Sequence, residues 1–314
     1  MGRYLKSLSL KLLTFFFTFF FTVNSSWAMP DDFSQSGKDQ PIVNDTQITA
    51  KKDGSFKTEQ KNSSEKKESL TRGQKTLLLN AGAWAAIMGY GLAEWDYNKS
   101  SFHFKKEGWF GRDTPYGGAD KLGHAWSCYV MSHLFAYLYR KWEYADREAN
   151  LYGALSSFGV NAVMEIFDGF SPSEGFSYED MTMNILGCGL GYILGEYPSL
   201  ARKFDFRWED TPKFDYKDLK IGTTYERHMY LLVAKADGFD FIENPYLKYL
   251  EFHLGYSARG YDDYEKGGPD DRHRRIYAGL GFNVSKLLQK YVKTTVFDYV
   301  QVPYTSIRQG FPLD

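Results

Sequence analysis

Four long apolar stretches between residues 76 and 195 constrain the fold more than any other feature of the chain. They cover residues 76–95, 124–142, 149–167 and 181–195. Each is long enough for a packed helix, and the first three approach the roughly 20 residues of a membrane span. Every stretch also contains polar positions that a lipid-exposed helix would avoid: Asn80, His133, Asn161, Glu165 and Asn184. The sequence therefore predicts a four-helix bundle, with a membrane-embedded or membrane-apposed bundle favoured over a soluble one.

Glycine recurs at every fourth position in the last of these stretches. Gly187, Gly191 and Gly195 lie on one face if the stretch is helical. Glycine inside a helix costs roughly 1 kcal/mol relative to alanine, so the repeat requires a packing reason. We expect a smooth stripe against which a neighbouring backbone packs closely. Loose use of glycine near a helix end is the alternative.

The chain beyond Pro198 has a different character. A polar and aromatic connector occupies residues 202–220. Four later stretches are rich in β-branched and aromatic residues with partial alternation: 222–235, 246–261, 274–284 and 293–304. Four or five strands are too few for a transmembrane barrel, which needs at least about eight. The predicted fold class is therefore α+β, a four-helix bundle followed by a small antiparallel β-sheet or meander.

The first 28 residues have the pattern of a secretory signal peptide. Basic residues precede an apolar core at 12–23, and Ser26-Trp27-Ala28 forms a small-x-small cleavage site. An uncleaved anchor is the alternative. Residues 29–70 contain few large apolar side chains and are rich in Lys, Ser, Asp and Gln, so we expect a disordered linker there. The remaining predicted domains are a helical domain at 71–204 and a β-rich region at 205–314.

Charge and composition narrow the range of partners. The 314 residues carry a formal net charge of −1, which gives no electrostatic case for nucleic-acid binding, and 18% of them are aromatic. Such an aromatic excess is typical of membrane interfaces or of β-rich packing. Cys128 and Cys188 both lie in apolar helical stretches. We expect buried free thiols, although an export compartment also permits a disulfide.

The start of the second apolar stretch combines an acid, a base and an imidazole. Asp120 and His124 are four positions apart and share a helix face, with Lys121 about 100° round the helix. His133 lies nine residues beyond His124, about half a turn away, and should face elsewhere. Of these residues, only His124 lacks a routine structural explanation.

A second group of polar residues surrounds the connection between the third and fourth stretches. Glu165 and Asp168 are three apart and share a face at the end of the third helix. Ser177 followed three residues later by Asp180 has the form of a helix N-cap with an acid in the first turn. Asn184 lies four residues beyond Asp180, on the same face. Short connections would bring both groups to one end of the bundle.

This set of side chains has three interpretations. Carboxylate oxygens and an imidazole nitrogen are normal ligands of divalent cations, so the candidate metal ligands are His124, Glu165, Asp168 and Asp180. The same groups could transfer protons, with His124 and Glu165 as the candidate catalytic residues. In the third interpretation they form a network that fixes helix register, and Lys121 neutralises part of the acidic charge. The expected binding residues are Asp120, Lys121, Asp168, Asp180 and Asn184.

At these residues the chain resembles known families. WFGRDTPYGGADKLGHAWSCY and the later EIFDGFSPSEGFSYEDMTMNILGCGLGY are similar to the YfiM-type family of predicted periplasmic proteins or lipoproteins, a domain of unknown function. The resemblance to the VanZ-like membrane family is more distant. The shared positions, within about 108–195, are Asp120, Lys121, His124, Glu165, Asp180, Asn184 and Gly187. Asp168 stands where VanZ-like sequences have glutamine, which favours the YfiM-type family; neither family implies a defined reaction.

These observations support three functional hypotheses. The first is an exported protein of the bacterial cell envelope, periplasmic or membrane-associated, that binds lipid, glycolipid or an envelope protein. The second is a metal-assisted or acid/base hydrolase that acts on a lipid headgroup or lipid-linked glycan, with a divalent metal as its cofactor. The third is a structural assembly protein, a homo-oligomer that would dissociate on deletion of residues 220–314.

Overall fold

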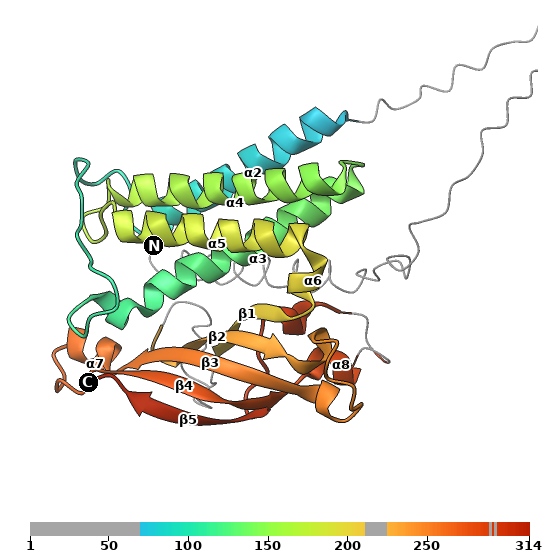
Figure 1. The fold of residues 1–314 in the computed structure, drawn as a ribbon. Helices are drawn as coiled ribbons and strands as arrows, with labels where there is room; N and C mark the ends of the chain where they lie inside the picture. The colour runs from blue at the N-terminus through green and yellow to red at the C-terminus, as the bar shows by residue number, and fades with distance from the viewer. Residues whose placement is uncertain (1–69, 211–224, 289–290, 292–293) are drawn as a thin grey trace, which may run out of the picture.

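The computed structural model describes residues 70–210, 225–288, 291 and 294–314. The predicted signal peptide at 1–28 lies outside these residues, as does the predicted linker up to residue 69. The described chain consists of long helices followed by a five-stranded antiparallel sheet, which confirms the predicted α+β class (Figure 1).

Four long helices form the first half of the fold: α2 (Arg72–Glu94), α3 (Ala119–Lys141), α4 (Asp146–Asp168) and α5 (Tyr178–Glu196). Their positions agree with the four apolar stretches, although α3 begins five residues before His124 and so includes the polar sequence at its start. Ser177 caps α5 by accepting a hydrogen bond from the Asp180 amide, as its sequence predicts. The predicted helical bundle is therefore confirmed.

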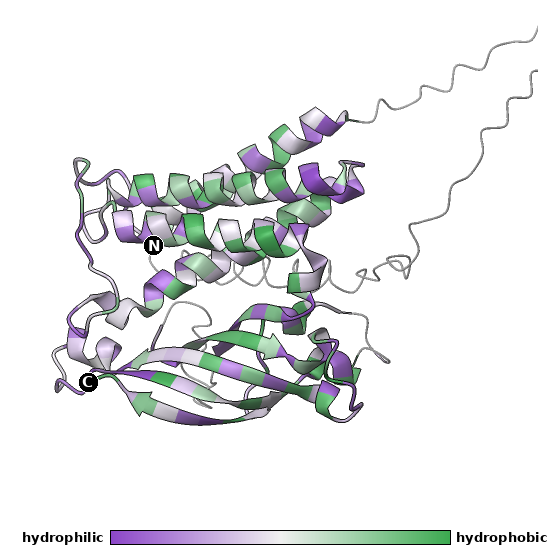
Figure 2. Ribbon diagram, viewed as in Figure 1, coloured by the Kyte–Doolittle hydropathy of each residue, from purple (hydrophilic) through white to green (hydrophobic). Residues whose placement is uncertain are grey.

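The helices are arranged so that α3 lies between the other helices and the sheet (Figure 1). Helix α3 packs against both α4 and α5 on one side and contacts strands β1 and β2 on the other. Apolar side chains remain exposed on the outer helices. Figure 2 shows hydrophobic segments of these helices in green. They are Leu77, Leu78, Trp84 and Leu92 on α2, Leu151, Leu155 and Ile166 on α4, and Ile185, Leu186 and Ile193 on α5.

The sheet is a meander with strand order β1-β2-β3-β4-β5. Its strands are β1 (Phe204–Asp210), β2 (His228–Lys235), β3 (Leu250–Arg259), β4 (His273–Phe282) and β5 (Ser306–Pro312). Short helical segments connect the elements: η1 (Pro115–Gly118), α6 (Pro198–Ala201), η2 (Tyr225–Arg227), η3 (Ala236–Gly238), η4 (Leu247–Tyr249), α7 (Tyr261–Glu265), α8 (Val284–Leu288) and η5 (Val296–Asp298).

Two strand assignments made from the sequence are wrong. The predicted connector at 202–220 contains strand β1, because the alternating FDFRW places Phe206 and Trp208 on the face that packs against α3. The strand predicted at 293–304 is replaced, within 294–304, by η5 and turns, although Val300 bridges to Trp208. The fifth strand follows at Ser306–Pro312.

The main hydrophobic core joins the bundle to the sheet. Ala125 and Tyr129 of α3 pack in one cluster with Phe206, Trp208 and Tyr230 of β1 and β2. The sheet is therefore fixed against α3, and the segments that follow its strands are held near the N-terminal end of that helix.

The glycine stripe on α5 packs closely against its neighbours, as predicted. A Cβ on Gly187 would lie 2.1 Å from the carbonyl oxygen of Ala125. Added Cβ atoms on Gly191 and Gly195 would lie 2.7 Å from Ser132 Cβ and 2.8 Å from Asn150 Oδ1. The stripe therefore lets α5 approach α3 at the level where both helices carry polar side chains. Cys128 and Cys188, at this interface, are buried free thiols, which confirms that prediction.

Gly187→Ala should destabilise the protein by roughly 3 kcal/mol, because the new methyl group must displace the backbone of α3. Gly189→Ala is the matched control on the same helix, since nothing lies within 4 Å of its added Cβ. That control should be neutral or stabilising by up to about 1 kcal/mol through helix propensity. Urea denaturation of both variants measures the difference, and equal free energies of unfolding would contradict the close approach.

Candidate functional site

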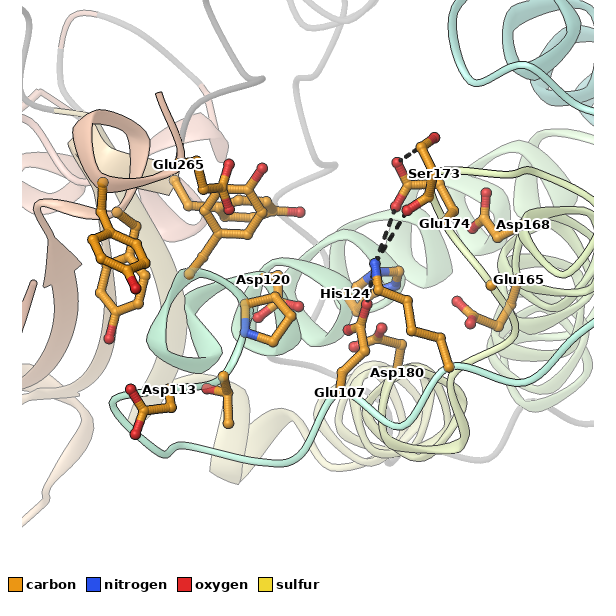
Figure 3. A pocket seen from close by; sticks show the side chains of 18 of the residues that line it. Glu107, Asp113, Asp120, His124, Glu165, Asp168, Ser173, Glu174, Asp180 and Glu265 are labelled. Atoms are coloured by element: carbon orange, nitrogen blue, oxygen red, sulfur yellow. Dashed lines mark hydrogen bonds and ion pairs between the residues drawn. The ribbon is translucent and has the colours of Figure 1, made fainter. Parts of the chain in front are cut away.

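A polar cavity of about 540 Å³ lies where α3 begins, α4 ends and α5 begins. Eight carboxylates and two cationic side chains line it, together with His124 and four tyrosines. Figure 3 shows Glu265 on the opposite side of the cavity from Asp168 and Glu174. The bundle therefore provides one wall, and segments beside the sheet provide the other: Tyr225, Tyr261, Tyr264, Glu265 and Arg272.

A glycine turn directs the chain into α3 at the cavity. Gly117 and Gly118 have φ angles of 59° and 81°, in the left-handed region that favours glycine. The Tyr261 hydroxyl would lie 2.6 Å from a Cβ on Gly117, so a larger residue would collide with it. This turn places Asp120 and Lys121 in the first turn of α3, inside the protein rather than at its surface.

Lys121 is fully buried and lies among three carboxylates. Its Nζ is 2.9 Å from Glu107 Oε2, 3.0 Å from Asp120 Oδ2 and 3.3 Å from Asp180 Oδ1. A buried ammonium is tolerated only when it is paired, because desolvation otherwise costs several kcal/mol. Its neutralising role was predicted from the sequence, whereas its partner Glu107, in the loop before α3, was not.

His124 is held by Asn184 across the interface of α3 and α5. Its Nδ1 lies 3.2 Å from Asn184 Oδ1, an oxygen that also accepts a hydrogen bond from the Cys128 thiol at 3.3 Å. Because this oxygen is the acceptor, Nδ1 carries the proton and donates it. In the neutral imidazole with this tautomer, Nε2 has a lone pair, the arrangement in which histidine binds a metal through one nitrogen and is oriented through the other.

Glu165 is oriented by the start of α5. Its Oε1 accepts a hydrogen bond from the Ser177 amide at 2.6 Å, and only 2% of the residue is exposed. Asp168, one turn later, accepts a hydrogen bond from the Tyr97 hydroxyl at 2.7 Å. Both carboxylates line the cavity. The end of α4 therefore presents two acids to the same space, as the spacing of three predicts.

Three of these side chains have the arrangement of a cation site. One donor atom each from His124, Glu165 and Asp180 lies within 4.8 Å of the other two. Zn²⁺ binds such nitrogen and oxygen donors at about 2.0–2.2 Å, so small rotamer changes would complete the coordination. A second group consists of Glu107, Asp120 and Asp180. Its donor atoms also lie within 4.8 Å of one another, and it shares Asp180 with the first group.

Burial makes ionisation of these acids unfavourable. It raises the pKa of Glu165 to about 9, of Asp168 to about 7 and of Asp120 to about 6. Burial also acts on Glu107, but its hydrogen bond to Asp180 and the Lys121 ammonium lower its pKa to about 2. The Lys121 ammonium contacts Glu107, Asp120 and Asp180, so it does not pair with Glu165 or Asp168.

Several polar atoms in the cluster are buried without a hydrogen-bond partner. They include Asp120 Oδ1, in a side chain that is 9% exposed and lines the cavity, and Asn184 Nδ2. Leaving such a group unpaired costs about 1–3 kcal/mol, and more when it is charged. A buried, unpaired carboxylate oxygen in a residue that lines an acidic cavity is a feature expected of a site that binds a ligand.

The sequence-predicted residues meet here with one difference in grouping. Asp120, Lys121 and Asn184 lie in the cluster, but the two compact donor groups do not include Asp168. His133 points away, as predicted: its Nδ1 lies 2.9 Å from the Tyr299 hydroxyl and its Nε2 2.9 Å from the Gly191 carbonyl. The residues missed from the sequence are Glu107, Tyr97 and the tyrosine wall of the cavity: Tyr116, Tyr225, Tyr261 and Tyr264.

His133 should make the protein less stable as the pH falls below about 6.5. Burial lowers its folded pKa to about 4, below the ordinary histidine pKa of about 6.5. A depressed histidine pKa means that stability is complete above 6.5 and is lost as the pH falls towards 4, on the order of 3 kcal/mol. His133→Asn should flatten urea-denaturation midpoints over this window, whereas His273→Asn, at a partly exposed position, should not. Parallel pH profiles for wild type and His133→Asn would contradict this.

Comparison with known proteins connects the site to one family. Residues 106–196 match the model of the DUF2279 family, described as a predicted periplasmic lipoprotein. This span contains Glu107 and the site-bearing helices α3, α4 and α5, but neither α2 nor the sheet. No curated protein and no solved structure matches the chain. The match supports an exported cell-envelope protein, in the periplasm or associated with a membrane, and it indicates no activity.

Proposed function

We propose that the protein is a membrane-associated hydrolase that uses one divalent cation to cleave an ester bond in an envelope lipid headgroup or lipid-linked glycan. The observation that carries the proposal is the convergence of His124, Glu165 and Asp180 donors within 4.8 Å at the wall of a 540 Å³ cavity. The proposal includes the binding of membrane lipid, which the sequence also suggests.

The chemistry of the donors selects the type of ion. One imidazole nitrogen and two carboxylate oxygens suit Zn²⁺ or Mn²⁺, since imidazole favours the former and carboxylate the latter. Such an ion would polarise the scissile ester and activate water. The predominantly acidic lining of the cavity also favours cation entry.

Asp168 is the residue that we assign to proton transfer. It lines the cavity outside the two compact donor groups, and Tyr97 fixes one of its oxygens. In the proposed reaction, Asp168 takes a proton from the attacking water as the new P–O bond forms. It then gives this proton to the departing alkoxide as the P–O bond of the phosphoester breaks, so one water yields a phosphate monoester and an alcohol.

The outer helices supply the membrane contact in this proposal. Exposed leucines and isoleucines occur on α2, α4 and α5, which lie away from the sheet (Figure 2). Within the described residues, α2 alone is long and apolar enough to cross a membrane. Large exposed apolar patches are typical of membrane or protein interaction sites. A bundle with this face on a bilayer would place the cavity at one end of the helices.

The test is hydrolysis of vesicles made of phosphatidylethanolamine and phosphatidylglycerol, with and without Mn²⁺, followed by mass spectrometry of the products. We expect metal-dependent release that a chelator stops and that Glu165→Gln abolishes. Glu148→Gln, an exposed position at the other end of the same helix, is the matched control and should retain activity. Vesicle binding without product formation would replace the hydrolase by a lipid-binding function, and absence of both would contradict the proposal.

A further inference from the structure

Two donor groups of the site share one carboxylate. The first consists of His124, Glu165 and Asp180, and the second of Glu107, Asp120 and Asp180. Within each group, the donor atoms lie within 4.8 Å of one another. Two adjacent groups joined by a common carboxylate are the arrangement of two-metal hydrolytic sites, in which the ions are about 3.5–4 Å apart.

The second group already surrounds a cation. The Lys121 ammonium lies 2.9, 3.0 and 3.3 Å from its three carboxylates, and the side chain has no exposed surface. It touches all three members of the second group, Glu107, Asp120 and Asp180. The second position is therefore filled by a covalently attached cation.

Among the described residues, the first group (His124, Glu165 and Asp180) does not surround an ammonium as the second group does. Within the part of the chain that the structure describes, Lys105 is the lysine that lines the cavity, and it pairs with Glu107 at 3.2 Å and with Glu174 at 3.9 Å. The buried Asp120 Oδ1 has no hydrogen-bond partner even with Lys121 in place. The Lys121 ammonium therefore leaves Glu165 of the first group without a contacting cation, and it leaves one buried oxygen of Asp120 in the second group unpaired.

We infer that Lys121 is the resident second cation of a two-cation site, so that the protein binds one divalent ion and Asp180 is shared between that ion and the ammonium. The inference rests on the proposed function, because it needs the first group to bind a metal. Lys121 is a positioning residue: it does not line the cavity, and its ammonium lies 3.3 Å from Asp180 Oδ1.

The test is Mn²⁺ stoichiometry, measured by native mass spectrometry, together with electron paramagnetic resonance of the bound ions. Wild type should bind one Mn²⁺ per chain with the spectrum of an isolated ion. Lys121→Met should raise the stoichiometry from one to two and give the spectrum of an exchange-coupled pair. Lys121→Arg, which keeps a cation in place, should still bind one ion.

Other results would overturn either the assignment of Lys121 or the proposed function. Two ions in wild type, or one isolated ion in Lys121→Met, would overturn the assignment of Lys121. Failure of Lys121→Met to fold even in Mn²⁺ would also overturn it, because the second ion should replace the lost ammonium. If wild type bound no Mn²⁺ while Lys121→Met bound one, the proposed function would fail but Lys121 would still mark a cation position.

Discussion

Replacing Lys121 with methionine should lower the free energy of unfolding by about 3–5 kcal/mol in buffer that contains a chelator. The substitution preserves the length of the side chain but removes the cation that three buried carboxylates surround. Loss of one partner from a buried ion pair leaves uncompensated charge in the interior, which costs far more than a surface pair contributes.

Urea denaturation of wild type and Lys121→Met measures this effect. Lys105→Met is the matched control, because its ammonium also pairs with Glu107 but is 35% exposed. That control should lose no more than about 1 kcal/mol. Equal losses in the two variants would show that the interior position of Lys121 has no special energetic role.

Substitutions in the proposed metal centre should produce a graded loss of Mn²⁺ affinity. His124→Ala removes a ligand and should weaken binding by more than about 100-fold, whereas Asn184→Ala removes only the residue that orients His124. Loss of such an orienting hydrogen bond typically costs about 10–100-fold. The difference in Mn²⁺ affinity between the two variants distinguishes a metal ligand from the residue that orients it.

Isothermal titration calorimetry of the folded variants provides this measurement. His273→Ala supplies a control histidine, whose Nδ1 contacts the backbone oxygen of Asp271 rather than the acidic cluster. It should bind Mn²⁺ as wild type does. Unchanged affinity in His124→Ala would contradict the proposed ligand set, and an equal loss in Asn184→Ala would indicate general disruption of the interface.

The helical half of the site could be predicted because it follows from residue spacings within single helices. Spacings of three and four residues place Asp120 with His124 and Glu165 with Asp168 on common faces. The Ser177 cap likewise fixes where α5 begins. Because the connection between α4 and α5 is short, the end of α4 and the start of α5 must lie close together.

The rest of the site depends on contacts between distant segments. Glu107 lies in a loop without periodicity, and its pairing with Lys121 follows from the path of that loop across the bundle. Three residues of the tyrosine wall, Tyr225, Tyr261 and Tyr264, belong to segments beside the sheet, more than a hundred residues after α3 begins. No local pattern predicts which of these turns meets the bundle.

The sheet illustrates a second limit of sequence patterns. Alternation along β3 correctly separates two faces, but Glu251 and His253 are buried while Phe252 and Leu254 are exposed. The charged face is stabilised by Arg207, which bonds both Glu251 oxygens at 2.8 Å. Burial here is decided by partners on another strand, and a pattern of period two does not contain that information.

Anomalous diffraction from crystals grown with Mn²⁺ would locate the bound ion. We expect one anomalous peak per chain in the cavity, about 2.0–2.3 Å from one donor atom each of His124, Glu165 and Asp180. The Lys121 ammonium should remain in contact with Asp180. A cavity without a peak at saturating Mn²⁺, or a peak bound by other residues, would contradict the proposed metal site.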